Sequence, residues 1–221
     1  SLANIFKVNK VKSLKNYAAK VFSMEIYNRF NETKIPTIKL LKKGITVHSE
    51  LLHPLVTKFI GYSPISFDHR TFQPVMIYEY CRNGSLEELI ANLQSNINIP
   101  KWDDTKKLIN IYGIAQCMEY LHSRNILHRD LSLSNVLVNE SLYPKLNDFS
   151  LAIPESESAE NEENVVGSDN YIAPEIWREH KYSKASDVYA YSIIVYSLLT
   201  SKLPRIGPNR ASVCYKVTNE N

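Results

Sequence analysis

Apolar and polar positions divide the chain into an early part with strand patterns and a later part with helix patterns. Apolar runs in residues 1–30, Val56–Tyr62 and Pro74–Tyr80 are rich in β-branched and aromatic residues, which favours strands. One helix is predicted after Pro36, since apolar residues recur there at helical spacing, at Ile38, Leu41, Ile45 and Leu52.

From Ser85 onward the pattern is mainly helical. Trp102–His122 gives the clearest helix, with Asp103 and Asp104 in its first turn. Its expected apolar stripe is Leu108, Ile111, Ala115, Met118 and Leu121. Short strands are predicted around residues 135–138 and 144–146, and a buried apolar helix over residues 186–200. Strands first and helices later indicate an α+β protein with two lobes joined near residues 79–84.

Composition fits one folded domain and excludes several function classes. The chain has 221 residues, of which 44% are hydrophobic and 22% charged, so it can bury a core. A net charge of +3 favours neither a nucleic-acid partner nor a membrane surface. The N-terminus lacks the apolar segment of a signal peptide, and the apolar run near residues 193–199 is too short to span a bilayer.

The three cysteines, Cys81, Cys117 and Cys214, are scattered along the chain. Their spacing matches neither a zinc site nor a disulfide framework. Reduced thiols are therefore expected, which favours a cytoplasmic location.

Five motifs carry the candidate chemistry. His128–Asn135 reads HRDLSLSN and matches H-R-D-L-x-x-x-N at every fixed position. Ala18-Ala19-Lys20 lies upstream on a predicted strand, and Asp148-Phe149-Ser150, Ala173-Pro174-Glu175 and Ser186-Asp187-Val188-Tyr189 follow in order. Any one of these matches could arise by chance, but their joint order and spacing make coincidence improbable.

In these motifs the chain resembles the eukaryotic protein-kinase family over roughly its whole length. The wording of KFIGYSP and EYCRNGSLEELI resembles the tyrosine-kinase-like branch of serine/threonine kinases. The resemblance implies a two-lobed fold with a β-rich N-lobe in residues 1–78, a hinge in residues 79–84 and a helical C-lobe in residues 85–221. It also implies a domain shortened at both ends, without its final helices.

The same resemblance assigns roles in phosphoryl transfer, which needs positioning and charge neutralisation. Asp130 would orient or accept the proton of the attacking hydroxyl. Asn135 and Asp148 would bind Mg²⁺, which prefers hard oxygen ligands. Lys20 would hold the α- and β-phosphates of ATP, and a protein hydroxyl would receive the γ-phosphate.

The adenine pocket follows from the same alignment. Val8 and Ala18 would form its roof, and Leu137 its floor. Tyr78 takes the gatekeeper position at the back of the pocket. The hinge, with Glu79 and Cys81, would offer backbone hydrogen bonds.

Two departures from the family pattern concern the N-lobe. With Val8 aligned to the valine of G-x-G-x-x-G-x-V, Ser1, Ala3 and Phe6 replace the glycines, so this loop should hold phosphates poorly. Gly44 stands where the helix glutamate that pairs with Lys20 is expected. A further substitution, His48, replaces an apolar residue of the spine that links the lobes.

Two more departures lie in the C-lobe. Ser132 replaces a lysine that neutralises the γ-phosphate, and Ser150 replaces the glycine of D-F-G. Each loss could cost about 1–3 kcal/mol of transition-state stabilisation.

The segment from Asp148 to Glu175 resembles an activation segment. Its middle, residues 155–163, holds five glutamates, which either form a solvated loop or pair with Arg129, alone or with phosphate on Ser156 or Ser158. Ser168 stands where serine/threonine kinases place a threonine against the catalytic aspartate. Glu175 is expected to lack its usual arginine, unless another local cation replaces it. Asp187 is expected to brace the catalytic loop.

Three functions remain open from the sequence. The first is an ATP-dependent protein serine/threonine kinase, favoured by intact Lys20, Asp130, Asn135 and Asp148. The second is a pseudokinase that serves as a scaffold or allosteric partner, favoured by the four departures. A small-molecule kinase is weaker, because Ala173-Pro174-Glu175 resembles peptide-substrate machinery.

Overall fold

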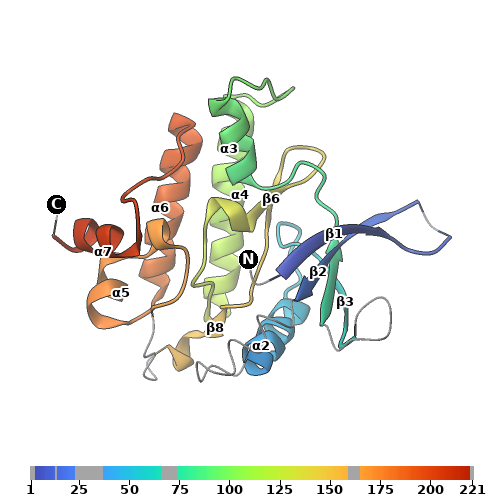
Figure 1. Cartoon of the computed structure of the whole chain (residues 1–221), viewed down its shortest axis with the longest axis horizontal. Helices are drawn as coiled ribbons and strands as arrows, with labels where there is room; N and C mark the ends of the chain where they lie inside the picture. The colour runs from blue at the N-terminus through green and yellow to red at the C-terminus, as the bar shows by residue number, and fades with distance from the viewer. Residues whose placement is uncertain (1–2, 13, 23–36, 66–73, 159–164, 220–221) are drawn as a thin grey trace.

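The computed structural model describes residues 3–12, 14–22, 37–65, 74–158 and 165–219. A β-rich part and a helical part lie side by side (Figure 1). The described residues of the β-rich part form four strands and one helix: β1 Ala3–Asn9, β2 Asn16–Phe22, α2 Thr37–Glu50, β3 Phe59–Ser63 and β4 Val75–Glu79.

The strands form one antiparallel sheet in the order β1-β2-β4-β3. Side chains alternate between its two faces, as the strand period of two requires. One face carries Ala18, Met76 and Tyr78 and packs against Ile45 of α2. The opposite face buries Ala19 and Val21 of β2 with Val75 of β4. The first face is the one that turns toward α2, and it also carries Lys20, which pairs with Met76 across the strands.

The helical part begins at a well-formed cap. Ser85 and Glu88 make a capping box at the start of α3 Leu86–Gln94. The next elements are α4 Asp104–Ser123, β5 Ile126–Leu127, η1 Leu133–Asn135, β6 Val136–Val138, β7 Pro144–Leu146 and β8 Ile153–Pro154. The chain then forms η2 Glu155–Glu157, η3 Asp169–Tyr171, α5 Pro174–Glu179, α6 Lys184–Thr200 and α7 Arg210–Asn219.

Helices α4 and α6 pack together at the centre of the helical part, while α5 and α7 lie beyond α6, farthest from the sheet (Figure 1). The main core joins α4 and α6 to α3 and to the strands β6 and β7. One side of this core holds Val47 and Leu51, at the end of α2, so the two parts share packed apolar surface. None of the helices in the described part is both long enough and apolar enough to cross a bilayer.

The predicted elements are mostly confirmed, with corrections at Val56, Leu52, Leu108 and helix α6. Val56 forms only an isolated bridge to Leu146, and the strand expected there begins at Phe59. Leu52 lies beyond the end of α2 and is 84% exposed. Leu108 was expected in the apolar stripe of α4 but is 60% exposed, because the buried face of the helix is centred on Ile114 and Met118.

Helix α6 was expected to be buried, and only part of it is. Its buried face carries Asp187, Ala190, Ile194 and Leu198. Val188, Tyr196 and Leu199 are more than half exposed. Hydropathy alone could not separate these faces, since both are apolar. The three cysteines are free, as expected.

Candidate active site

The segment His128–Asn135 is held in place by hydrogen bonds to Asp187, a buried residue of α6. Its Oδ2 accepts from the backbone N–H of His128 at 2.9 Å, and its Oδ1 from that of Arg129 at 3.0 Å. His122 Nε2 lies 3.0 Å from the same Oδ2. These bonds hold Arg129 at φ 65°, a left-handed conformation that a non-glycine residue rarely adopts. Asp187 therefore braces the loop, as the sequence predicted.

The Asp130 carboxylate is oriented on both oxygens. Its Oδ1 accepts from the backbone N–H and from the hydroxyl of Ser168, each at 2.8 Å. Its Oδ2 accepts from Asn135 Nδ2 at 2.8 Å, and the same amide group donates to the Asp130 carbonyl. Gly167, at φ 105°, lets the chain pass close to the Arg129 carbonyl before Ser168 turns inward. The contact predicted between Ser168 and Asp130 is thus present.

Burial raises the pKa of Asp130 above its usual value, and the nearby negative charge of Asp148 raises it further. Hydrogen bonds from Ser168 and Asn135 act in the opposite direction. The carboxyl is therefore a stronger proton acceptor than an exposed aspartate.

Lys20 forms an ion pair with Asp148: Nζ lies 2.6 Å from Oδ2. Burial by itself would raise the pKa of Asp148, but the charge and hydrogen bond of Lys20, with help from Ser150, hold this pKa below its usual value. Asp148 is held at φ 58°, and its neighbour Asn147 donates a backbone hydrogen bond to the Asn135 carbonyl at 2.8 Å. The β-rich part thus contacts the metal-binding candidates directly.

The four predicted side chains meet in space. Lys20 binds Asp148, Asn135 binds Asp130, and the negative charge of Asp148 is close enough to raise the pKa of Asp130. They come from β2, the loop before η1, the end of η1 and the second residue after β7, so the fold brings these separate segments together.

Gly44 leaves no side chain between α2 and the Asp148–Ser150 segment. A Cβ added to Gly44 would lie 3.2 Å from the Phe149 carbonyl oxygen, so the helix backbone packs directly on this segment. Phe149 is buried and contacts His48, with ring centroids 4.6 Å apart, and His128, at 5.1 Å. The His48 ring also lies 5.1 Å from Tyr78. An aromatic column therefore links the sheet, α2 and the catalytic loop.

The polar His48 is accommodated in this column by one hydrogen bond. Its Nε2 lies 2.6 Å from the Thr57 carbonyl oxygen. Burial lowers the pKa of His48 to about 4, so the ring is neutral at neutral pH. The sequence placed His48 in the spine, and the structure supplies the partner that a buried imidazole needs.

The predicted roof of the adenine pocket needs a correction at Val8. In the antiparallel pairing, Val8 lies opposite Tyr17 and packs with Ala19 and Val21 on the far face of the sheet. The residue opposite Lys20 is Ile5, and directly paired residues share a face. Ile5, and Lys7 opposite Ala18, therefore lie on the face where Val8 was expected. The sequence alone did not show this, because the register of β1 on β2 cannot be read from one strand.

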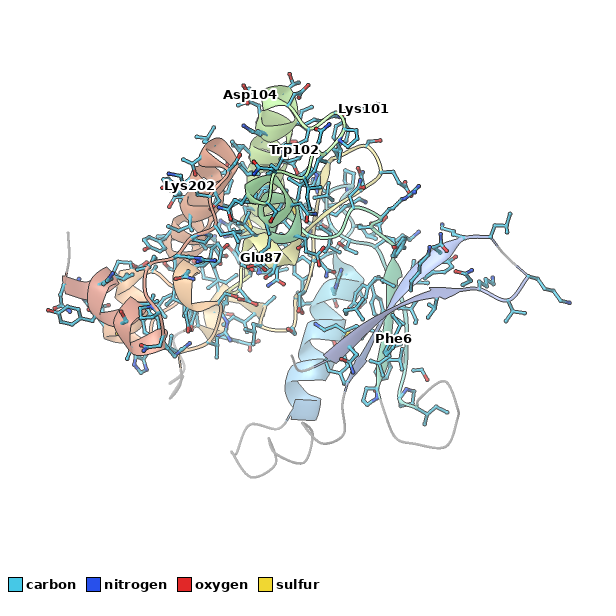
Figure 2. The ribbon with its side chains drawn as sticks, turned by 45° about the horizontal axis from the view of Figure 1, so that its top comes forward. Phe6, Glu87, Lys101, Trp102, Asp104 and Lys202 are labelled. Carbon is cyan, nitrogen blue, oxygen red and sulfur yellow. The ribbon has the colours of Figure 1, made fainter. Side chains whose placement is uncertain are left out.

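The residues aligned with the glycines are not in a loop. Ala3 and Phe6 lie in the regular strand β1, where Figure 2 labels Phe6, which is 49% exposed. Phe6 pairs with Ala19, so it lies on the face away from Lys20. Ser1 falls outside the described residues. In this extended strand alternate N–H groups point to β2, so the backbone of β1 does not form the turn that gathers successive N–H groups around a phosphate.

The remaining pocket residues lie along one edge of the site. Ala18 faces Tyr78 across the strands, and Leu137 lies on β6 next to Ser85. Glu79 ends β4, and its carboxylate binds Lys145 at 2.8 Å. The Cys81 backbone N–H makes no hydrogen bond within the described part of the chain, and burial raises the pKa of the Cys81 thiol to about 12.

Of two further C-lobe predictions, that for Ser132 has a definite outcome, and pairing of Arg129 with the acidic loop stays a prediction. Ser132 is buried and its hydroxyl bonds that of Ser134 at 2.9 Å, so this position supplies no cation. Arg129 donates to the Leu151 carbonyl at 2.8 Å and stacks on the Tyr182 ring. Much of the acidic loop, residues 159–164, lies outside the described residues.

Glu175 has no cation within 4.0 Å among the described residues. The nearby arginine, Arg210 of α7, binds Asp169 and stacks on Trp177 instead. Sequence reasoning did not identify Arg210, because no motif marks it.

Comparisons with known proteins agree with this geometry. The family model described as "Protein kinase domain" matches residues 1–220. The probable serine/threonine-protein kinase drkD of Dictyostelium discoideum is 33% identical over 187 residues, 83% of this chain and 14% of that protein. The serine/threonine-protein kinase polo of Drosophila melanogaster is 29% identical over 202 residues, 91% of this chain and 32% of that protein.

A human relative, the putative 3-phosphoinositide-dependent protein kinase 2, is 28% identical over 220 residues, 98% of this chain and 51% of that protein. The chain thus spans about half or less of the length of these relatives. They do not single out the tyrosine-kinase-like branch, which stays a prediction. Because the family model matches residues 1–220 of the 221-residue chain, the chain belongs to the protein kinase family.

Proposed function

We propose that the chain is an ATP-dependent protein kinase that transfers the γ-phosphate to serine or threonine. The observation that carries the proposal is the double hydrogen bond from Ser168 to Asp130 Oδ1, with Asn135 on Oδ2. A carboxylate fixed on both oxygens is ready to orient an acceptor hydroxyl without further rearrangement. The three relatives named above carry serine/threonine-kinase or protein-kinase names.

In this proposal Asp130 takes the proton of the acceptor hydroxyl. Its raised pKa suits it to that task, because a general base works best when its pKa approaches the working pH. Ser168 keeps the carboxylate turned toward the peptide side of the site. Lys20 supplies the positive charge for the phosphates of ATP.

A divalent cation fits the oxygen donors present. Both bonds of the Asn135 amide group to Asp130 use Nδ2, so the amide oxygen remains to bind a cation. Asp148 stays ionised, since its pKa is lowered. A carboxylate and an amide oxygen suit Mg²⁺. When bound, the cation would neutralise phosphate charge, and Lys20 would be shared between Asp148 and the nucleotide.

Nucleotide recognition at the hinge is supported by the Cys81 N–H, which no described residue engages. It is a backbone donor at the position where the alignment expects adenine. Ile5, in place of Val8, and Ala18 would cover the ring from the sheet side.

The test is transfer of radiolabelled γ-phosphate to myelin basic protein, followed by identification of the labelled residues. Wild type is expected to label serine or threonine, and Asp130→Asn to lose at least about a hundredfold in rate. Equal labelling by both proteins would mean that a contaminating kinase is responsible. Labelled tyrosine would refute the serine/threonine assignment.

A pseudokinase is the second candidate, because Lys20 is already paired with Asp148 and β1 runs as a regular strand where the family has its glycine loop. That function predicts no transfer above the Asp130→Asn background. Thermal shift with ATP and Mg²⁺ then separates a nucleotide-binding scaffold from one that binds none.

A further inference from the structure

Residues 165–169 form a loop that contacts the catalytic loop. On the inner side, Ser168 binds Asp130, and the Val166 N–H donates to the Tyr182 hydroxyl at 2.6 Å. The Tyr182 hydroxyl donates in turn to the Val166 carbonyl at 2.8 Å. These bonds tie the loop to Asp130 and to the Tyr182 side chain.

The same loop is also held by a side chain from a distant helix. Arg210, the first residue of α7, forms an ion pair with Asp169 and donates to the Val165 carbonyl at 2.6 Å. Its guanidinium also lies 4.8 Å from the centre of the Trp177 ring in α5. One planar group thus contacts both ends of the loop and the helix that follows it.

Asn170, the residue directly after the loop, is bonded to the same region. The Ile206 N–H, four residues before Arg210, donates to Asn170 Oδ1 at 3.2 Å. Helices α5 and α7 also pack together (Figure 1). The segment before α7 and the helix itself therefore contact the region of residues 165–170.

We propose that Arg210 is a positioning residue that holds residues 165–169 in the conformation in which Ser168 orients Asp130. The proposal rests on the proposed kinase function. Arg210 does not touch the reacting groups; it acts through the backbone of Val165 and the carboxylate of Asp169, so it should affect use of the protein substrate and leave nucleotide binding unchanged.

The guanidinium geometry is essential to this role. The Arg210–Asp169 pair is about half exposed, and an exposed ion pair alone contributes little. Arginine adds a second, directed bond to Val165 and planar stacking on Trp177, which lysine cannot reproduce together. We call the three contacts of Arg210, with Asp169, Val165 and Trp177, the Arg210 clamp. A lysine at position 210 would keep the charge but could not make all three contacts.

The experiment compares wild type with Arg210→Gln and Arg210→Lys, with Lys216→Gln on the same helix as control. Steady-state kinetics with myelin basic protein should give a KM about fivefold higher in R210Q, with an unchanged KM for ATP. R210K should recover less than half of this loss, and K216Q should match wild type. An equal change in both KM values, or none, would overturn the proposal.

Hydrogen exchange makes the test independent of catalysis. The Val166 and Ser168 amides are bonded to Tyr182 and Asp130, so they should exchange slowly in wild type and faster in R210Q. If R210Q exchanges faster but neither wild type nor the variants transfer phosphate, the kinase function is refuted and the positioning role of Arg210 is supported. Unchanged exchange in R210Q would refute the clamp, whatever the activity.

Discussion

Gly44 and Ser150 lie in direct contact: a Cβ added to Gly44 would stand 2.8 Å from the Ser150 Cα. Each residue departs from the kinase pattern, since a glutamate is expected at the first position and a glycine at the second. The structure makes the two departures parts of one arrangement. Without a side chain at Gly44, α2 packs on the backbone at Ser150, and Lys20 pairs with Asp148 instead of the helix.

This contact predicts that Gly44→Ala destabilises the protein. Alanine improves helix propensity by about 1 kcal/mol, but overpacking against a backbone costs about 1–3 kcal/mol. We expect a net loss of about 1 kcal/mol in urea unfolding and reduced phosphotransfer. Ser49→Ala, at an exposed position of α2, is the control and should stay within about 0.5 kcal/mol of wild type. A more stable Gly44→Ala protein would contradict the close approach.

The predicted metal role of Asp148 can be tested by ligand-dependent stability. ATP with Mg²⁺ at a hundred times its dissociation constant should add about 2.7 kcal/mol to wild type. Asp148→Asn should lose most of this gain, and Asp104→Asn should keep it, because Asp104 points to solvent at the start of α4 (Figure 2). A full gain in Asp148→Asn would exclude the carboxylate as a metal ligand.

The acid limb of the rate profile should report Asp130. This residue works only when ionised, and its pKa is raised while that of Asp148 is lowered. As pH falls, Asp130 therefore gains its proton first, and kcat/KM should begin to fall at a higher pH than an ordinary aspartate would give. Ser168→Ala removes a hydrogen bond that lowers this pKa, so the limb should move to still higher pH. A limb that moves the other way would contradict the assignment.

His48 should make stability depend on pH. Its folded pKa is about 4 against 6.5 unfolded, so below pH 6.5 the unfolded chain binds the proton first and stability falls until about pH 4. The loss from this group is about 3 kcal/mol at most. His48→Leu should flatten the dependence of Tm on pH between these values. An unchanged slope would mean that other groups cause it.

Asp187 should be sensitive to truncation. It is buried and accepts hydrogen bonds from the backbone N–H groups of His128 and Arg129, which would be left buried without this acceptor. Asp187→Ala should lower the free energy of unfolding by about 2–5 kcal/mol, measured by urea denaturation. Asp104→Ala, at a carboxylate that is 92% exposed, should change it by less than about 0.5 kcal/mol. Similar losses in both variants would argue against the bracing role.

The sequence by itself determined the family and the identity of the chemical groups. Lys20, Asp130, Asn135 and Asp148 could be found because phosphoryl transfer needs particular residue types in a particular order. The helix α4 was also predictable, since long helical periodicity is a strong local signal.

Tertiary structure decided which groups meet and which face each strand presents. Val8 was assigned to the wrong face because a one-residue change of register moves a side chain across the sheet, and pairing fixes the register. The Lys20–Asp148 pair and the Arg210 clamp join residues 128 and 45 positions apart, and local sequence carries no signal for such contacts. Burial in the folded state, which no single segment contains, set the proton affinities of Asp130 and His48.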